Sequence, residues 1–294
     1  MKVCSLTWKL LSSEFVECLE AFSIIKVPMM WIDTHCHLDA AEFADQADAV
    51  AHRAADQQVQ MIVIPAVEVA NFAEVGRLAH AHANCSYALG IHPIFVPQAQ
   101  ESDLQVLREA VGQAMSDPRF VAIGEIGLDF FVPLLTEPAM REKQAHFYAE
   151  QLKIARDFDL PVLLHVRRSQ DQILKHLRRI KVPGGIAHAF NGSFQQAQIF
   201  IDLDFKLGFG GAMTFTRALQ LRRLASELPL ESIVLETDAP DISPAWLHPE
   251  KNSPEQLPRI GEVLAELRNM APHDIARATS DNARTVMPRL AALF

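Results

Sequence analysis

An α/β fold of the (β/α)8 TIM-barrel type is predicted by two features of this 294-residue chain. Eight short apolar runs alternate with segments of helical periodicity along residues 31–290, and histidines and acidic residues stand where the runs stop. Strands separated by helices are joined by right-handed crossovers into a parallel sheet, and eight such units most naturally close into a barrel. An open, doubly wound sheet is the alternative.

The apolar runs are interpreted as strands because they are short, apolar and bounded by turn or helix signals. They lie at residues 31–34, 61–66, 87–91, 121–126, 161–166, 185–189, 205–210 and 233–237. Between them, apolar residues recur every three or four positions, as on one face of a helix. The expected helices span residues 47–57, 71–81, 104–114, 141–158, 169–180, 193–201, 218–228, 258–270 and 272–290.

The chain divides into an extension, residues 1–29, and one barrel domain, residues 30–294. Acidic residues such as Glu14 interrupt the apolar core that a secretory signal would need. Met29 and Met30 stand directly before the first strand, so we interpret the extension as the product of an upstream start codon and expect it to be dispensable. A functional lid is the alternative.

Composition restricts the classes of partner. No apolar stretch approaches the roughly 20 residues of a membrane span, and four cysteines without paired spacing are typical of a reducing cytosol, so we expect a cytoplasmic protein, without membrane contact, that is a monomer. The net charge of -9 argues against tight nonspecific binding of nucleic acid through a broad basic surface. A nucleic-acid substrate would have to be held locally.

Two histidines follow the first predicted strand. His35 and His37 are separated by one residue, so both imidazoles project to the same face of an extended chain. Cys36 between them should point the other way and act as a small buried hydrophobe. Neighbouring imidazoles are costly to bury without a purpose, so we expect both histidines to be metal ligands.

Four further donors end later runs: Glu125 the fourth, His165 the fifth, His188 the sixth and Asp238 the eighth. Imidazoles and carboxylates are the usual ligands of catalytic divalent metals. The two oxygens of Glu125 can bridge two cations, which would lower the pKa of a bound water and polarise the bond to be broken. Asp238 can bind a metal and also accept the proton of the attacking water. The donor set predicts a metal-dependent hydrolase with Mg²⁺, Mn²⁺ or Zn²⁺.

Candidate substrate contacts lie beside these donors. His92, at the end of the third run, could contact a scissile phosphate or pair with a carboxylate such as Asp129. Arg167, Arg168 and Arg217 follow the fifth and seventh runs, and a guanidinium fork suits phosphate. One of these arginines is expected to belong only to a solvated face.

Seven ordered motifs complete the pattern. They are DTHCHLD at 33–39, GIHP at 90–93, GEIGLD at 124–129, HVRR at 165–168, HAF at 188–190, ETDAP at 236–240 and NSPE at 252–255. Together they resemble the TatD family of metal-dependent deoxyribonucleases, most closely its YjjV-like branch, over about residues 30–290. The resemblance implies an amidohydrolase-like barrel with two divalent cations. One would be held by His35, His37, Glu125 and Asp238, the other by Glu125, His165 and His188.

Two positions depart from the family pattern. Ile94 stands where many members carry a second histidine, and Ala189 stands where many carry a cysteine. Neither position belongs to the six proposed ligands. Ile94 is expected to line the pocket mouth, so substrate preference does not follow from the resemblance alone. The extension at residues 1–29 has no family counterpart.

Three function classes fit this sequence. The first is a phosphodiesterase of the 3′–5′ exonuclease type acting on DNA, preferably on single-stranded or frayed ends, because only a frayed end can enter a barrel mouth. The second is an amidohydrolase or lactonase, with an aminoacyl-tRNA deacylase as a variant. The third, a noncatalytic metal-binding protein, is disfavoured by the full ligand set. Related barrels acting on amides or triesters often bridge their metals with a carboxylated lysine on the fourth strand, so Glu125 at that place favours the first.

Overall fold

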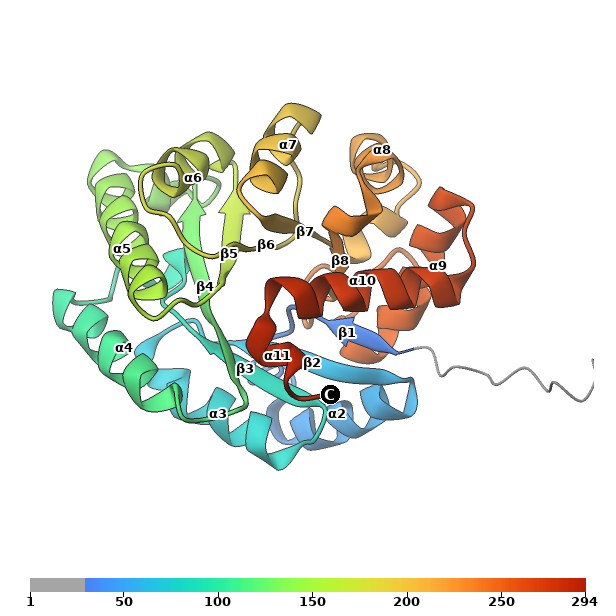
Figure 1. Ribbon diagram of the computed structural model, residues 1–294, viewed down its shortest axis with the longest axis horizontal. Coiled ribbons are helices and arrows are strands. Elements are labelled where there is room, and N and C mark those ends of the chain that lie inside the picture. The colour runs from blue at the N-terminus through green and yellow to red at the C-terminus, as the bar shows by residue number, and fades with distance from the viewer. Residues whose placement is uncertain (1–29) are drawn as a thin grey trace, which may run out of the picture.

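Residues 30–294, the part of the chain that the computed structural model describes, form one sheet of eight parallel strands (Figure 1). The strands are β1 (Trp31–Asp33), β2 (Val59–Pro65), β3 (Cys85–Leu89), β4 (Phe120–Asp129), β5 (Val162–Arg167), β6 (Gly185–Ala187), β7 (Phe205–Phe209) and β8 (Ile233–Leu235). Each strand pairs with the next one along the chain. The predicted barrel is confirmed, and the doubly wound alternative is wrong because the strand order never reverses.

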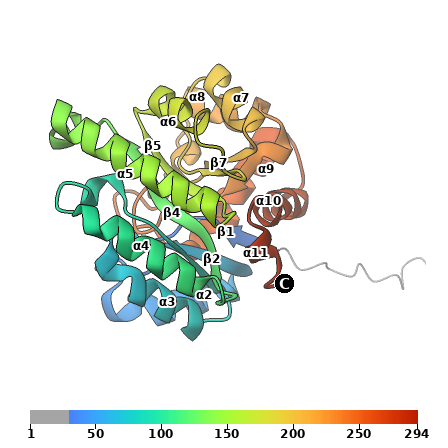
Figure 2. The ribbon, with the colours of Figure 1, turned by 60° about the vertical axis from the view of Figure 1, so that its left-hand side comes forward.

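Helices surround the strands (Figures 1 and 2). They are α2 (Ala47–Asp56), α3 (Phe72–Ala81), α4 (Glu101–Ala114), α5 (Pro138–Asp157), α6 (Gln170–Leu177), α7 (Phe194–Asp202), α8 (Leu219–Glu227), α9 (Leu257–Arg268), α10 (Pro272–Val286) and α11 (Pro288–Ala291). The single helix expected at residues 272–290 is wrong, because Pro288 has no N–H to continue α10 and starts α11 instead. No helix of residues 30–294 is long and apolar enough to cross a membrane.

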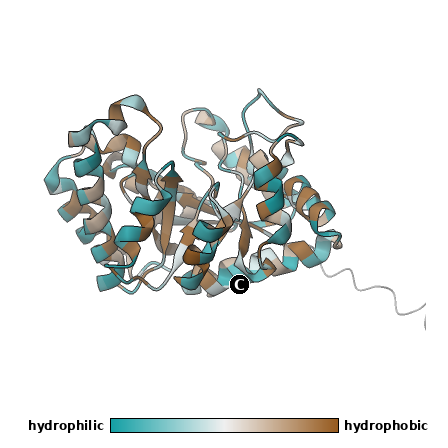
Figure 3. Cartoon of the chain, turned by 90° about the horizontal axis from the view of Figure 1, so that it is seen from above, coloured by the Kyte–Doolittle hydropathy of each residue, from teal (hydrophilic) through white to brown (hydrophobic). Residues whose placement is uncertain are grey.

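The C-terminal helices close one end of the barrel. Side chains that point inward from the strands, such as Ile32, Val63 and Leu163, pack in one buried cluster with Val286 and Leu290 of α10 and α11. Figure 1 shows these two helices lying across the ring of strands, and Figure 3 shows apolar residues on the strands and polar residues on the outer helix faces. Because α10 and α11 cover the end of the barrel at the amino ends of the strands, the site is expected at the opposite end, where the carboxyl ends of the strands lie.

The barrel closes between β8 and β1 through residues that follow both strands. The N–H of Asp238 donates to the carbonyl of His35 at 2.8 Å, and the N–H of His37 donates to the carbonyl of Ala239 at 2.8 Å. The loop after β8 is thereby fixed against the loop after β1. This seam joins predicted ligands that are about 200 positions apart in the chain.

A buried carboxylate reinforces the seam. Asp33 accepts the N–H of Thr237 at 2.9 Å and the N–H of His35 at 3.2 Å through Oδ1, and the hydroxyl of Thr237 at 2.6 Å through Oδ2. Its burial raises the pKa of the carboxyl group to about 7, against the lowering effect of these donors. Asp33 therefore serves the closure of the barrel, with both oxygens engaged by protein.

The structure also settles the expectations about the cysteines that it covers. Cys36 is fully buried among apolar side chains, which confirms its interpretation as a buried hydrophobe, and Cys85 is likewise buried and free. The extension at residues 1–29, with Cys4 and Cys18, lies outside the described residues, so its dispensability stays a prediction.

The contact between α9 and β1 gives a test of the packing. A methyl group at Gly261 would overlap the buried indole ring of Trp31, whereas one at Gly76 of α3 would only touch Tyr87 at 4.0 Å. Gly261→Ala should lower the free energy of unfolding by about 1–3 kcal/mol through overpacking. The matched control, Gly76→Ala, should be neutral or gain up to about 1 kcal/mol from helix propensity. Denaturant unfolding measures both; equal effects of the two variants would contradict this packing.

Candidate metal centre

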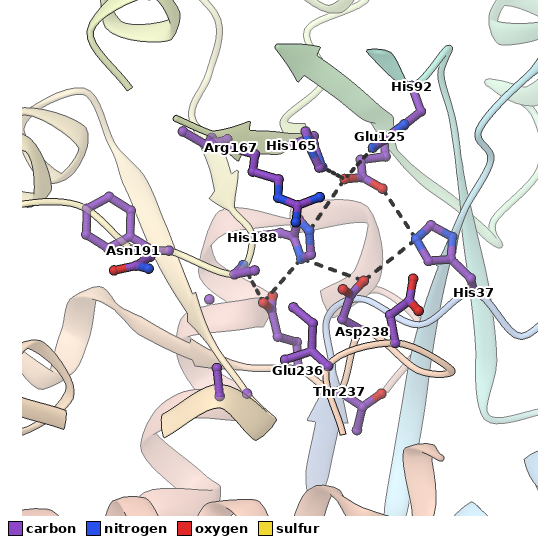
Figure 4. A pocket seen from close by; sticks show the side chains of 18 of the residues that line it. His37, His92, Glu125, His165, Arg167, His188, Asn191, Glu236, Thr237 and Asp238 are labelled. Atoms are coloured by element: carbon purple, nitrogen blue, oxygen red, sulfur yellow. Dashed lines mark hydrogen bonds and ion pairs between the residues drawn. The ribbon is translucent and has the colours of Figure 1, made fainter. Parts of the chain in front are cut away.

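A cavity of about 1160 Å³ opens at the carboxyl ends of the strands. Residues that lie within or follow every strand line it, in chain order His37, Val67, His92, Glu125, His165, His188, Gly210 and Asp238. His35 lies fully buried directly behind this wall. All six predicted ligands, and His92 with them, therefore meet at one place, and we call these seven side chains the donor cluster. Figure 4 labels all of them except His35.

Glu125 lies at the centre of the donor cluster, and its two oxygens face different histidines. Oε2 lies 3.1 Å from Nε2 of His35 and 3.4 Å from Nε2 of His37. These two imidazole nitrogens are themselves 3.3 Å apart. Three donor atoms thus converge on one point, which is the arrangement of a metal site.

The other oxygen of Glu125 faces three imidazoles. Oε1 lies 3.0 Å from Nδ1 of His165, 3.4 Å from Nε2 of His92 and 3.5 Å from Nε2 of His188. His188 also stacks on the ring of His35, with centroids 3.9 Å apart. The carboxylate therefore separates two groups of nitrogen ligands, one at each of its oxygens.

Glycines let the strands approach closely enough for this geometry. Gly127, two residues beyond Glu125, has φ of 149°, and a side chain there would overlap the backbone carbonyl of His165. A side chain at Gly124 would meet Cβ of Leu163 at 2.5 Å. The GEIGLD motif thus packs β4 tightly against β5, and this places Glu125 next to His165.

Asp238 completes the donor cluster from the β8 side. Its Oδ1 lies 3.7 Å from Nε2 of His37, 3.8 Å from Nε2 of His35 and 4.0 Å from Nδ1 of His188. Its backbone is left-handed, with φ of 56°, a conformation that aspartate tolerates better than most residues. Burial raises the pKa of Asp238 to about 6.

The protonation of the donor cluster suits divalent cations. Burial lowers the pKa of His35 to about 3 and that of His92 to about 4, so both offer neutral nitrogens. Burial acts to raise the pKa of Glu125, but the imidazoles around it lower that pKa well below its ordinary value. For His37, burial is outweighed by the carboxylates of Glu125 and Asp238, which raise the pKa to about 9. Its proton is one that a bound cation would displace.

Three groups of donors fit a cation by distance, with atoms within 4.8 Å of one another. They are His35, His37 and Glu125; His92, Glu125 and His165; and His35, His188 and Asp238. The buried Nδ1 atom of His35 has no hydrogen-bond partner among the described residues. These nitrogens and carboxylate oxygens are ligands that zinc, manganese and related cations accept.

His92 both lines the cavity and faces Glu125 through its Nε2 atom, so its expected contact with substrate stays a prediction. Its alternative pairing with Asp129 is not found among residues 30–294. Asp129 instead lies 3.0 Å from Nε2 of His165, the ring nitrogen that points away from Glu125. Such a carboxylate fixes the orientation of an imidazole ligand and makes it more basic.

Glu236 is a site residue that the sequence reasoning missed. Its buried carboxylate accepts the N–H of Ala189 at 2.5 Å and lies 3.3 Å from Nδ1 of His188, so it orients this imidazole. A side chain at Gly208 would overlap it. The signal was present: Glu236 and Asp238 are separated by one residue, the spacing that identified His35 and His37.

The three candidate arginines do not lie together. Arg167 and Arg168 line the main cavity. Arg217 lines an adjoining hollow instead, where its guanidinium carbon lies 5.4 Å from the ring centroid of Phe215. Arg217 is thus the arginine that lies outside the main cavity, because the chain after β7 continues through a 3-10 turn, Gly211–Thr214, before reaching it, and its contact with substrate stays a prediction.

Comparison with known proteins identifies the family. Residues 32–288 match the family described as TatD related DNase. The chain belongs to the TatD family. The metal-dependent hydrolase YjjV of Escherichia coli is 40% identical over 257 residues, which cover 87% of this chain and 97% of YjjV. This confirms the resemblance inferred from the TatD motifs, including the YjjV-like branch.

A solved structure and a second relative extend the comparison. The crystal structure of YjjV superposes with a TM-score of 0.82 and covers 88% of this chain and 98% of that chain. The 3′-5′ ssDNA/RNA exonuclease TatD of Shigella flexneri is 30% identical over 261 residues, 86% of this chain and 97% of that protein. The chain is thus a metal-dependent hydrolase of the TatD family with the TIM-barrel fold of its relatives.

Because Glu125 lies at the centre of the donor cluster, its removal should weaken cation binding more than the removal of a single histidine. Glu125→Ala removes the carboxylate that two of the donor groups share, so it should lose more bound divalent cation than His92→Ala, which removes one terminal nitrogen. Elemental analysis after dialysis against Mn²⁺ measures the difference. The melting temperature of each variant serves as the folding control, and wild-type cation content in Glu125→Ala would refute the shared role.

Proposed function

We propose that this chain is a two-metal phosphodiesterase that removes nucleotides from DNA ends in the 3′–5′ direction, as a cytoplasmic monomer. The observation that carries this proposal is the arrangement of Glu125, whose Oε2 faces His35 and His37 while its Oε1 faces His92, His165 and His188. A carboxylate shared in this way is typical of two-cation sites, which suit in-line displacement at phosphorus.

The donor cluster divides naturally between two cations, Mg²⁺, Mn²⁺ or Zn²⁺. His35, His37, Glu125 and Asp238 would hold one cation; Glu125 and His165 would hold the other, with His188 or His92 as its further nitrogen ligand. When bound, the cations would lower the pKa of a water molecule toward neutrality and polarise the phosphoryl group.

Asp238 is the proposed proton acceptor for the attacking water. It faces His35 and His37, which lie at one oxygen of Glu125, and His188, which lies at the other. It also lines the cavity, so it can reach a water molecule there. Its pKa, raised by burial to about 6, leaves it ionised at neutral pH and still basic enough to take a proton. His188, oriented by Glu236, lies beside it.

Arg167 and Arg168 are the proposed phosphate contacts. Both line the cavity next to the donor cluster, and an otherwise acidic chain offers few other cations for a polyanion there. The donor cluster lies at the base of a barrel mouth, which an intact duplex is too wide to enter. We therefore propose single-stranded or frayed DNA ends as the substrate, in line with the name of the Shigella flexneri relative, a 3′-5′ ssDNA/RNA exonuclease.

A second candidate is an ester or amide hydrolase that uses the same donor cluster. Its support is the carboxylates Asp39, Glu42 and Asp241, which line the same cavity. Their charge suits a substrate with a protonated amine, such as an aminoacyl ester on transfer RNA, better than it suits a phosphate. A lactonase or amidohydrolase acting on a small ring belongs to the same class.

One assay separates these two classes. Metal-depleted protein is supplied in turn with Mg²⁺, Mn²⁺ and Zn²⁺ and offered end-labelled single-stranded DNA, blunt duplex, closed circular DNA, aminoacyl-tRNA and a panel of lactones. We expect restored cleavage of the single strand from its 3′ end and little cleavage of the duplex or the circle. Turnover of the esters alone, or efficient cutting of circles, would overturn the end-specific nuclease.

The role of Asp238 predicts a rate effect. Asp238→Asn keeps the shape of the side chain but removes the basic oxygen, so kcat should fall by about 10²–10⁴-fold while KM changes much less. Asp241→Asn, which changes another carboxylate lining the same cavity, should stay within a few-fold of wild type. Steady-state kinetics at matched cation occupancy measure kcat and KM for both variants. A near-normal kcat in Asp238→Asn would exclude Asp238 as the base.

The two arginines predict a shallow salt dependence of DNA binding. Two phosphate contacts on a single strand correspond to a log–log slope of roughly -1.4, whereas a broad basic groove would give a much steeper one. The double variant Arg167→Ala/Arg168→Ala should flatten the slope, and Arg217→Ala, which alters the adjoining hollow, should leave it unchanged. Fluorescence anisotropy with labelled oligonucleotide across a salt series measures the slopes. An unchanged slope in the double variant would remove both arginines from the DNA path.

A further inference from the structure

The guanidinium groups of two arginines lie against one exposed aromatic ring at the cavity mouth. Phe131, two residues beyond the end of β4, is 44% exposed and lines the cavity. The guanidinium carbon of Arg167 lies 3.9 Å from the centroid of its ring, and that of Arg168 lies 4.6 Å from it. Both distances are within the range of cation–π attraction, which is worth about 0.5–1 kcal/mol at an exposed site.

The backbone holds this arrangement in place. Oδ1 of the buried Asp129 accepts the N–H of Phe131 at 2.7 Å, so the turn after β4 presents the ring in a fixed position. The N–H of Phe130 donates to the carbonyl of Arg167 at 2.9 Å, which ties this turn to the end of β5. The backbone therefore holds the turn that carries the ring beside the strand end that carries Arg167.

The two guanidinium groups keep their hydrogen-bond donors available for a ligand. Within residues 30–294, the ion pairs of these two side chains comprise one long contact, from Arg167 to Oδ2 of Asp129 at 3.9 Å. The side chain of Arg167 is 49% exposed. The two guanidinium groups repel each other, and Phe131 holds both of them close together. An anion that binds between them is therefore favoured, because it offsets this repulsion.

The path of the chain places the two arginines at different depths. Arg167 follows His165 by two residues on β5, so their side chains share a face about 6.6 Å apart along the strand. Figure 4 shows the Arg167 guanidinium reaching over the donor cluster. Arg168 comes after the end of β5 and has a left-handed backbone, with φ of 56°. Arg167 can therefore reach a phosphate at the donor cluster, and Arg168 can reach the next phosphate outward.

Charge across the mouth supports one direction for a phosphate chain. The carboxylates Asp39, Glu42 and Asp241 belong to the loops after β1 and β8, which lie across the eight-stranded ring from β4 and β5. A polyanion is repelled on that side and attracted on the side of Arg167 and Arg168. The strand should thus leave the donor cluster over β4 and β5.

We propose that Phe131 positions Arg167 and Arg168 as a clamp for two consecutive phosphates of a nucleic-acid strand. Arg167 meets the phosphate at the donor cluster, and Arg168 meets its neighbour. The second contact makes the enzyme prefer a strand with at least two phosphodiesters over a substrate with one. Phe131 acts through the arginines as a positioning residue. This inference rests on the proposed phosphodiesterase function.

The test compares a thymidine dinucleotide, which has one phosphodiester, with the trinucleotide, which has two. In the wild-type holoenzyme, the additional charge-assisted contact should favour the trinucleotide by about tenfold in kcat/KM, mainly through KM. Phe131→Leu and Arg168→Ala should each reduce this preference to about threefold or less, whereas Phe131→Tyr, which retains the ring, should preserve it. Leu134→Ala, a change at another exposed apolar residue of the same loop, should also preserve it.

The outcomes separate the clamp from the proposed function. Cleavage of both substrates with a preference that survives in Phe131→Leu and Arg168→Ala would overturn the clamp and leave the phosphodiesterase intact. An equal loss on both substrates in Phe131→Leu would also overturn it, because such a loss indicates a merely structural role. If the wild-type protein cleaves neither oligonucleotide while it hydrolyses esters, the phosphodiesterase fails and the clamp fails with it.

Discussion

The site depends on one buried charge, the carboxylate of Glu125. A carboxylate with almost no exposure is costly in a protein interior unless other groups compensate it, and here imidazoles at both oxygens do so. Five strand ends must meet for that compensation, so the parallel barrel and its closure between β8 and β1 are conditions for the site. The same charge makes Glu125 the natural shared ligand of two cations. If it were neutral or displaced, both groups of nitrogens would lose their common partner.

Three further carboxylates support this arrangement in different ways. Asp33 accepts hydrogen bonds from Thr237 at the seam between β8 and β1. Asp129 orients His165 and also fixes the turn that contains Phe131. Glu236 orients His188. Each contacts a residue of the donor cluster through a hydrogen bond or an ion pair. The positions of the imidazoles are thus determined by protein contacts, and the cavity presents them to a substrate already oriented.

The sequence predicted the barrel and the six proposed ligands because each of these residues ends an apolar run, and parallel strands bring their ends together. It predicted the same-face geometry of His35 and His37 from the period of an extended chain. It did not place His92 inside the donor cluster, since the depth of a strand end depends on register shifts between neighbours such as β3 and β4. It did not say which of the three arginines lies outside the main cavity, because the route of the loop that carries Arg217 is set by tertiary packing that no periodicity encodes. Phe131 escaped notice for a similar reason: its role comes from contacts with a different strand.

The central claim is that Glu125 is shared by two cations, and diffraction from crystals soaked in Mn²⁺ tests it most directly. The account predicts two anomalous peaks per chain, one between Oε2 of Glu125 and the pair His35 and His37, the other between Oε1 of Glu125 and His165. A single peak at saturating Mn²⁺, or peaks that do not contact Glu125, would contradict it.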